Sequence, residues 1–445
     1  DPQLLESTFG HSVKLTINES IQAVTQNVLQ QGVEKSNADA GVAVCYAVKT
    51  GEMLAVASYP SFDLNNLRTS PEQRVNRALS HAIEPGSVMK IITFASLFDD
   101  KKIEPFDVIN CEGGTWVMPH GRVIRDSKRL GTASVAEVFQ YSSNIGTIKA
   151  ARAFDNAANY DHLVKFGFNK KTGIDLPHES NGVLAHHRDW SGLSMSSLPM
   201  GYEIQLTAMQ VVGAVGAIAN KGDYMQPHVV KEILDHNGNT IQKIEPKIVR
   251  SVADPAACRK IVDLMELVVT KGTAKAAQLD GYRVGGKTGT TKKLVNGRYE
   301  NAYIASFCGI APIEDPEVCI YVYVDNPKGD KMYGGSVAAP IFREICRETM
   351  KVLRVPERRP TMPADELKKT LENVRSQIEG RVPMEMVSEV AETDDGEVSQ
   401  GVVPQLKNLT LREAVERAAA VGLTLVPTGS GVIVSQSPGA NETIE

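Results

Sequence analysis

Long hydrophobic stretches are missing from this 445-residue sequence: no apolar run approaches the roughly 18 residues that a helix needs to cross a bilayer. No segment has the pattern of a cleaved signal peptide. The chain opens on Asp1 rather than on a methionine, so we expect it to be the ordered part of a longer protein. Its length and its 42% hydrophobic residues predict two or three globular domains with a full core.

An excess of charge is missing as well. The sequence has 48 Lys and Arg against 53 Asp and Glu, a formal net charge of −5, which excludes an overall basic field for nucleic acid or anionic membrane. It has no Cys-x-x-Cys pair, no histidine spacing typical of zinc and no phosphate-binding glycine loop. We therefore predict neither a metal nor a cofactor, and no nucleic-acid partner.

Cysteine is scarce, with six residues in the whole chain. Cys45, Cys308 and Cys319 lie in apolar, strand-like runs, which favours buried free thiols. Cys308 and Cys319 could face each other across a hairpin, but the sequence does not establish a disulfide and leaves the redox compartment open.

What the sequence does contain is a serine and a lysine at the start of an apolar helix. Pro85 and Gly86 break the chain, and residues 88–98 then read as a helix, so Ser87 lies at its N-terminus with Lys90 one turn later. A serine hydroxyl is a weak nucleophile that needs a neighbouring base. Taken alone, the pattern also fits an N-cap serine with a solvated lysine.

Two further motifs follow in order. Ser142-Ser143-Asn144 comes about 55 residues later, and Lys287-Thr288-Gly289-Thr290 lies beyond it in a strand-like context. Ser142 could relay a proton, Asn144 could bond a substrate amide and brace Lys90, and Lys287 could lower the pKa of Lys90 as a second cation. Gly289 would admit a substrate backbone, while Thr288 and Thr290 could bind a terminal carboxylate. Alone, the Ser-Ser-Asn cluster equally fits a helix end that satisfies its own backbone.

Ser-x-x-Lys, Ser-x-Asn and Lys-Thr-Gly-Thr in this order resemble the motifs of the penicillin-binding proteins, and the Tyr-Pro-Ser-Phe-Asp turn at 59–63 is similar to that of class B members. The resemblance, over about residues 14–350, implies a serine-type D-Ala-D-Ala transpeptidase acting on peptidoglycan stem peptides through a Ser87 acyl-enzyme, with β-lactams as covalent inhibitors. It also implies an oxyanion hole from the backbone N–H groups of Ser87 and Thr290.

The pattern of elements predicts an α/β multidomain protein, a mostly antiparallel sheet flanked by helices with an α-helical subdomain; a sheet of five strands is implied by the resemblance. We assign strands and helices to the segments that have a regular spacing of hydrophobic residues or are bounded by turn-forming residues. Strands are expected at 41–48, 53–58, 116–118, 122–124, 229–234, 240–244, 284–289, 303–311 and 318–325, and helices after Asn18 and at 88–98, 135–142, 150–168, 208–219, 255–269 and 338–353.

Three domains are predicted: a transpeptidase domain at 1–354, a linker at 355–400 and a small module at 401–445. The linker contains a charged helix candidate at 364–378 and an acidic, polar stretch at 389–400. In the module, Val-Pro, a helix at 410–421, a strand at 423–426 and Val-Ser-Gln-Ser-Pro-Gly are similar to a PASTA domain, a βαββ unit. The family's final strand would lie past Glu445, so we expect this copy to be truncated. A wall-binding role and a structural role both stay open for it.

The family implies a membrane location: a single-pass N-terminal anchor outside this chain, an extracytoplasmic catalytic domain, and a SEDS-type glycosyltransferase and divisome proteins as partners. The PASTA-like end favours a septal or spore-wall role over elongation. Two alternatives remain. A serine β-lactamase would need a deacylating base, and the Glu-x-x-Leu-Asn pattern is absent. A non-catalytic β-lactam sensor or wall-binding receptor would usually carry a signalling domain, and none is visible.

Overall fold

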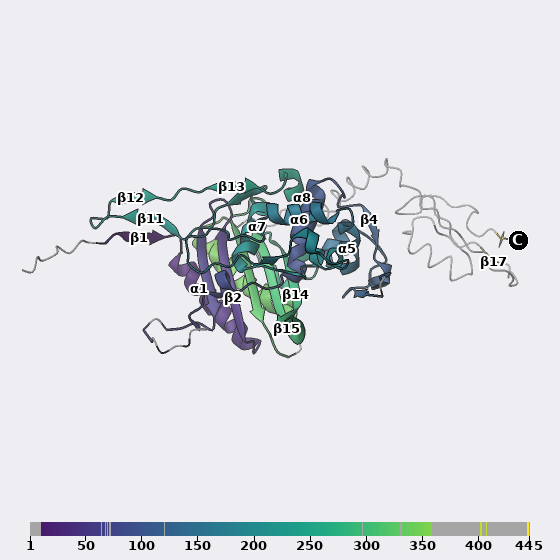
Figure 1. Cartoon of the computed structure of the whole chain (residues 1–445), viewed down its shortest axis with the longest axis horizontal. Coiled ribbons are helices and arrows are strands. Elements are labelled where there is room, and N and C mark those ends of the chain that lie inside the picture. The colour runs from purple at the N-terminus through teal and green to yellow at the C-terminus, as the bar shows by residue number, and fades with distance from the viewer. Residues whose placement is uncertain are drawn as a thin grey trace, which may run out of the picture. The chain divides into compact units, whose positions relative to one another are not determined.

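The computed structural model describes residues 10–357 except 64, 67, 69, 71, 72, 120, 296, 330 and 331, together with residues 401, 402, 406, 443 and 444. The chain divides into two compact units, Asp1–Asp365 and Glu366–Glu445. Figure 1 shows the first unit as a sheet with helices packed around it. The predicted domain boundaries at 354 and 400 stay a prediction.

The first unit is built around a five-stranded antiparallel sheet in the order β14-β15-β16-β2-β3. Its strands are β2 (Ala40–Ala47), β3 (Met53–Tyr59), β14 (Gly285–Val295), β15 (Arg298–Ala311) and β16 (Val318–Asp325). Most of β2, β16 and the second half of β15 is buried, as expected for a sheet covered on both faces. The five strands and the β2–β3 hairpin predicted from sequence are confirmed.

Helices cover the two faces. Helices α1 (Glu19–Lys35) and α9 (Gly334–Val352) pack on each other, with Gly32 against Ile341, and Gly41 of β2 faces α1. Helices α7 (Ala208–Ala219) and α8 (Pro255–Thr270) contact the sheet as well, and Gly216 of α7 packs on Tyr46 of β2. Because side chains 41 and 46 point to opposite faces of β2, α1 and α7 lie on opposite sides of the sheet.

A helical region lies between β3 and α7, as the sequence predicts. It contains α2 (Arg77–Ser80), α3 (Lys90–Asp99), α4 (Val135–Gln140), α5 (Asn144–Ala151) and α6 (Asn156–Lys165). The prediction of one helix over 150–168 is wrong: α5 ends at Ala151, and α6 begins after Asp155, whose carboxylate caps it by accepting from the Ala158 N–H.

Small strand pairs complete this region and the edge of the unit. The short strands β5 (Thr115–Val117) and β6 (Val123–Arg125) are close to those predicted. Four further short strands were not predicted: β4 (Val108–Asn110), β7 (Thr132–Ser134), β8 (Val183–Leu184) and β9 (Ile204–Gln205). The predicted hairpin is confirmed as β11 (Val230–Leu234) and β12 (Thr240–Lys243). Strand β1 (Ser12–Leu15), which sequence reasoning missed, pairs with β11, and β10 (Asp223–Met225) pairs with β13 (Ile248–Ser251).

One loop prediction is corrected. The polar composition of residues 291–298 predicts a loop, but the structure continues β14 as far as Val295 and pairs it with β15, for example Leu294 with Tyr299. Its polar residues lie on a hairpin that extends past the buried sheet, where exposed strand positions carry no hydrophobic signal.

All six cysteines are buried free thiols, as predicted. Cys308 and Cys319 lie on neighbouring strands with their Sγ atoms 3.8 Å apart, as thiols rather than a disulfide. In the second unit, β17 (Gly401–Val402) pairs antiparallel with β18 (Thr443–Ile444). The helices predicted at 364–378 and 410–421 and the strand at 423–426 lie outside the described residues.

Candidate active site

Ser87 lies in a tight turn that leads directly into a buried helix. The turn is a 3₁₀ segment, Gly86–Met89, and α3 follows from Lys90, so the predicted helix N-terminus is confirmed. Gly86 has a φ of 53°, a region that favours glycine, and its N–H donates to the carbonyl of Gly201 at 3.2 Å. Ser87 is partly exposed, and its hydroxyl has no hydrogen-bond partner among the described residues.

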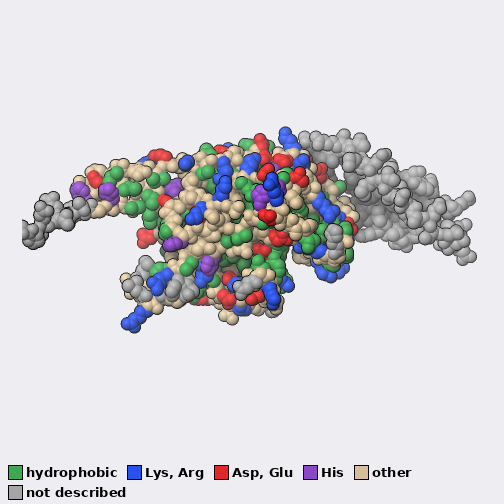
Figure 2. Space-filling view, in the orientation of Figure 1, with side chains coloured by type: hydrophobic (Ala, Val, Ile, Leu, Met, Phe, Trp, Pro, Cys, Tyr) green, Lys and Arg blue, Asp and Glu red, His purple; other side chains and the backbone are tan. Residues whose placement is uncertain are grey.

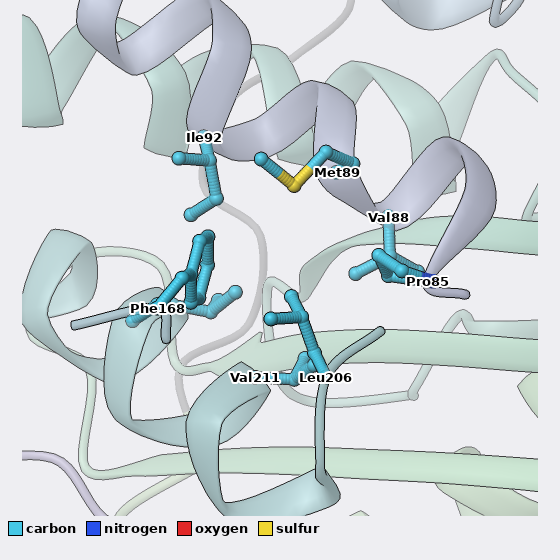
Figure 3. A pocket seen from close by; sticks show the side chains of 9 residues that line it. Pro85, Val88, Met89, Ile92, Phe168, Leu206 and Val211 are labelled. Atoms are coloured by element: carbon cyan, nitrogen blue, oxygen red, sulfur yellow. The ribbon is translucent and has the colours of Figure 1, made fainter. Parts of the chain in front are cut away.

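Behind this turn the packing is apolar and nearly complete. Figure 3 shows side chains from the turn, including Pro85, Val88 and Met89, pointing into a small space together with Phe168 and Leu206. The cavity there is about 10 Å³, no more than one water would need. The Ser87 turn is therefore backed by closely packed carbon, which holds the hydroxyl toward the opposite, open side.

Lys90 is fully buried, and its amine is surrounded by acceptors from the second motif. Its Nζ donates to the Ser142 carbonyl (2.7 Å), the Asn144 Oδ1 (2.8 Å), the Ser143 carbonyl (3.2 Å) and the Ser142 Oγ (3.3 Å). The structure thus brings Lys90, Ser142 and Asn144 together. No hydrogen bond joins Lys90 to Ser87 among the described contacts; the partners of the Lys90 amine there all belong to residues 142–144.

The 142–144 loop is held in place by a residue that the sequence did not single out. Asp126, just after β6, accepts from the Ser143 hydroxyl at 2.5 Å and from the backbone N–H groups of Asn144 and Ile145 at 2.6 and 3.1 Å. Its carboxylate therefore caps the N-terminus of α5, where negative charge is favoured. Ser142 adopts a φ of 59°, unusual for a residue with a side chain, which turns its carbonyl toward Lys90.

Burial controls the protonation of both lysines. Desolvation lowers the pKa of Lys90 to about 7, opposed by the negative charge of Asp126, which raises it. The pKa of Lys287 is lowered well below its ordinary value by burial and by the charge of Lys90. Among the described residues the buried Lys287 Nζ has no hydrogen-bond partner and lies 5.8 Å from the centroid of the Phe139 ring, so a second positive charge beside Lys90 is poorly compensated. A lysine that is half neutral at pH 7 can accept a proton.

Strand β14 packs against the Ser87 turn and carries the third motif. The space next to Gly289 is filled by the Ser306 side chain, the Pro85 carbonyl and Val88, so the missing side chain lets β14 approach the Ser87 turn. The Thr288 Oγ1 lies 2.9 Å from the Thr273 Oγ1. The Thr290 Oγ1 accepts from the Gly334 N–H at 3.1 Å, which leaves its own O–H free to donate.

A second residue missed from sequence is Glu84, three positions before Ser87. Its Oε1 accepts from the Glu203 N–H at 2.9 Å and from the Tyr299 hydroxyl at 3.0 Å, while its Oε2 is buried without a partner. Burial raises the pKa of this carboxyl. Glu84 lies three residues before Ser87, and an acid beside a motif is a signal that could have drawn attention to it. Asp126 lies sixteen residues before Ser142, so the sequence gives no such signal for it.

One group of side chains in the described part of the chain has the spacing of a metal site: Asp99, Asp100 and His162. The His162 Nε2 lies 3.2 Å from the Asp100 Oδ1, and the Asp99 Oδ2 lies 3.1 Å from the Lys165 Nζ. Asp99 ends α3 and Asp100 is its C-cap, about 18 Å along the helix from Ser87. The group therefore lies away from the Ser87 turn.

Comparisons with known proteins show the class of the fold that brings Lys90, Ser142 and Asn144 together: it is a penicillin-binding transpeptidase fold. The family described as penicillin binding protein transpeptidase domain matches residues 41–347, and the PASTA domain family matches residues 401–445. The chain belongs to the penicillin-binding protein transpeptidase family and carries a PASTA domain at its C-terminal end.

Individual relatives agree with this. The chain is 35% identical over 357 residues to stage V sporulation protein D of Bacillus subtilis, covering 79% of this chain and 55% of that protein. It is 31% identical to the probable peptidoglycan D,D-transpeptidase PenA of Neisseria flavescens, covering 79% and 85%. The chain thus spans little more than half of the sporulation protein.

Solved structures give the same fold. The transpeptidase domain of penicillin-binding protein 3 from Burkholderia pseudomallei superposes with a TM-score of 0.68 at 32% identity, covering 78% of this chain and 98% of that one. Penicillin-binding protein 3 of Mycobacterium tuberculosis, complexed with ampicillin, gives 0.75 at 31% identity, covering 80% and 82%. Within the described residues, no helix combines the length and the hydrophobicity needed to cross a membrane.

Proposed function

We propose that this chain is a serine D,D-transpeptidase that cross-links peptidoglycan stem peptides and is acylated by β-lactams at Ser87. The observation that carries the proposal is the Lys90 amine, fully buried, with a pKa of about 7 and oriented by Ser142 and Asn144. A base of this kind suits removal of the Ser87 proton at neutral pH.

In this mechanism the Ser87 oxygen attacks the carbonyl of the penultimate D-Ala, and its proton moves to the Lys90 Nζ. The tetrahedral intermediate then collapses, breaking the D-Ala–D-Ala peptide bond, and the proton passes through the Ser142 hydroxyl to the departing nitrogen. The amine of a second stem then attacks the acyl-enzyme carbonyl and gives up a proton through Ser142 and Lys90. The bond to Ser87 breaks, the Ser87 oxygen takes the proton, and the acyl group is left on the second stem as a new peptide bond. The backbone N–H groups of Ser87 and Thr290 would hold the oxyanion.

The donor stem's terminal carboxylate would bind at β14. The free O–H of Thr290 and the Thr288 hydroxyl supply donors of the right kind, with the buried amine of Lys287 behind them on the same strand. Gly289 keeps the strand close to Ser87, so the carboxylate and the scissile bond are held by the same element.

The wider role is proposed from the relatives. Similarity to a sporulation protein and to D,D-transpeptidases, together with the PASTA domain, supports a septal or spore-wall enzyme. Such an enzyme would be anchored in the membrane by a segment outside this chain, with its catalytic domain on the extracytoplasmic side and a SEDS-type glycosyltransferase and division proteins as partners.

The test is intact-mass spectrometry after incubation with a penicillin, followed for hours, with Ser87→Ala as the control. A single adduct that persists and is absent from the control supports the proposal, and release of D-Ala from a pentapeptide with transfer to an added amine completes it. An adduct that disappears within seconds identifies a β-lactamase. A persistent adduct without any transfer identifies a sensor, and no adduct contradicts the proposed nucleophile.

A further inference from the structure

Exposed basic side chains lie beside the 142–144 loop without acidic partners. Arg125, Lys128 and Arg129, here called the basic rim, are all exposed. None of them forms an ion pair with any acidic side chain that the structure describes. Three unpaired cations together are notable in a chain whose net charge is −5.

The one acid within this segment faces inward. The Asp126 carboxylate accepts hydrogen bonds from the Ser143 hydroxyl and from two N–H groups at the start of α5. Its hydrogen bonds therefore fix the segment to the catalytic loop while its charge compensates the helix end rather than the rim. The basic side chains on either side of Asp126 are exposed. Figure 2 shows lysine and arginine side chains in blue at many places on the face that it draws.

The rim is coupled closely to the proposed catalytic groups. The Arg125 carbonyl accepts from the Asn144 Nδ2 at 3.1 Å, and the Oδ1 of the same amide accepts from the Lys90 Nζ at 2.8 Å. Two hydrogen bonds thus join Arg125 to the lysine. The Lys128 Nζ lies 3.2 Å from the centroid of the Tyr141 ring, and Tyr141 directly precedes Ser142. This cation–π contact holds the ammonium at the edge of the site.

The proposed reaction needs two stem peptides, a donor and an acceptor, and the position of the basic rim indicates which of them it could bind. The donor stem is assigned to β14, where its carboxylate meets Thr288 and Thr290. The rim belongs to the other wall, built by β6 and the α4–α5 loop, so its charges are free for the second peptide. A stem peptide that ends in D-Ala carries a carboxylate, which arginine and lysine bind by charge-assisted hydrogen bonds.

We propose that the basic rim binds a free carboxylate of the acceptor stem peptide and so selects carboxylate-bearing acceptors for the acyl-enzyme. The proposal rests on the transpeptidase function proposed above. It predicts that an acceptor whose carboxylates are amidated is used less well than the free acid, through a higher KM and an unchanged kcat.

The experiment compares the wild-type chain with the triple variant Arg125→Gln, Lys128→Gln, Arg129→Gln. The matched control, Lys170→Gln, Lys171→Gln, Lys221→Gln, makes the same charge change at exposed lysines that form no ion pair with the described residues. Each protein is acylated by a thioester donor and given the same acceptor peptide as free acid or amide. Each transfer rate is divided by that protein's penicillin acylation rate, which corrects for any loss of folded enzyme.

For wild type and control we expect the free acid to have a KM about two- to fivefold lower than the amide, since an exposed ion pair gives a factor of about 1.5 to 5. In the rim variant the two forms should become equal, and the wild-type preference should shrink with added salt. An equal preference for acid over amide in wild type and rim variant overturns the proposal.

Failure of the transpeptidase function has a different signature, because wild type then gives no transfer product with either acceptor. In that case, equilibrium binding of both peptide forms is measured by NMR saturation transfer on wild type and rim variant. Preferential binding of the acid to wild type alone supports the carboxylate subsite without catalysis, and equal binding by both proteins overturns it.

Discussion

Asparagine in place of Asp126 tests how the protonation of Lys90 is set. The carboxylate accepts three hydrogen bonds from the 142–144 loop and α5, and its charge raises the pKa of Lys90 against the effect of burial. Asparagine keeps the shape and removes the charge. Loss of a nearby opposite charge should lower the pKa of Lys90 by about one unit, or about 1.4 kcal/mol. Loss of the charged acceptor for Ser143 should cost about 2 kcal/mol of unfolding free energy.

The direction in which the acylation rate changes with pH follows from the proposed role of Lys90 as a base. Only neutral Lys90 accepts the Ser87 proton, so the acylation rate should rise with pH through the pKa of about 7. In Asp126→Asn the midpoint should fall to near pH 6, while the plateau rate drops about tenfold because the loop is less well fixed. The assay is the rate of acylation by a fluorescent penicillin between pH 5 and pH 9.

Asp155→Asn is the matched control. Asp155 also caps a helix, accepting from the Ala158 N–H at 2.8 Å, but it lies at the start of α6 and touches none of the candidate site residues. It should lose a comparable amount of stability and keep the wild-type pH midpoint. If the Asp126→Asn midpoint stays at the wild-type value or moves upward, the electrostatic part of the reasoning is wrong, whatever happens to the plateau.

Three further substitutions give independent checks. Gly201→Ala should lower the unfolding free energy by about 2–4 kcal/mol and slow acylation, because Gly201 has a φ of 83° and a Cβ there meets the backbone of Gly86. Urea unfolding measures the loss. Gly131→Ala is the control and should be nearly neutral, because Gly131 has open space around it. Glu84→Gln should add about 1 kcal/mol of stability at pH 8 and little at pH 4. Burial raises the pKa of Glu84, so the wild type loses stability as the pH rises from 4.5 through that pKa. An unchanged pH dependence of the unfolding free energy in the variant would contradict this. Lys287→Met should slow acylation at least about 100-fold yet leave the unfolding free energy equal or higher, because the Lys287 amine is buried without a partner; a marked loss of stability would show that the amine is satisfied.

The sequence predicted the parts of the fold that carry strong local signals. The β2–β3 hairpin, α7 and α8 have clear hydrophobic patterns and turn residues, and all are confirmed close to their predicted bounds. The outer half of β14 was missed because an exposed hairpin has no apolar alternation to detect. Strand β1 was missed because its partner, β11, lies more than 200 residues away, a distance that no local pattern reports.

The candidate site divides in the same way. Ser87, Lys90, Ser142, Asn144 and the β14 residues come from short motifs, so they could be identified from the sequence. The structure joins Lys90 to Ser142 and Asn144 by hydrogen bonds and packs β14 against the Ser87 turn. The contributions of Asp126 and Glu84 were not readable, since they depend on which backbone N–H groups the fold places within reach of a carboxylate. Their catalytic importance remains a prediction until the variants are measured.

The acceptors that hold Lys90 have a consequence for how the domain can evolve. Two of them, the carbonyls of Ser142 and Ser143, belong to the main chain, so no change of side chain at these positions removes the acceptor atom itself. In the proposed mechanism, a change that stops Lys90 from activating Ser87 would block the reaction with a covalent inhibitor and the reaction with the stem peptide alike. Substitutions that preserve the proposed reaction are therefore expected in side chains around the site, which affect the binding of a ligand rather than its reaction.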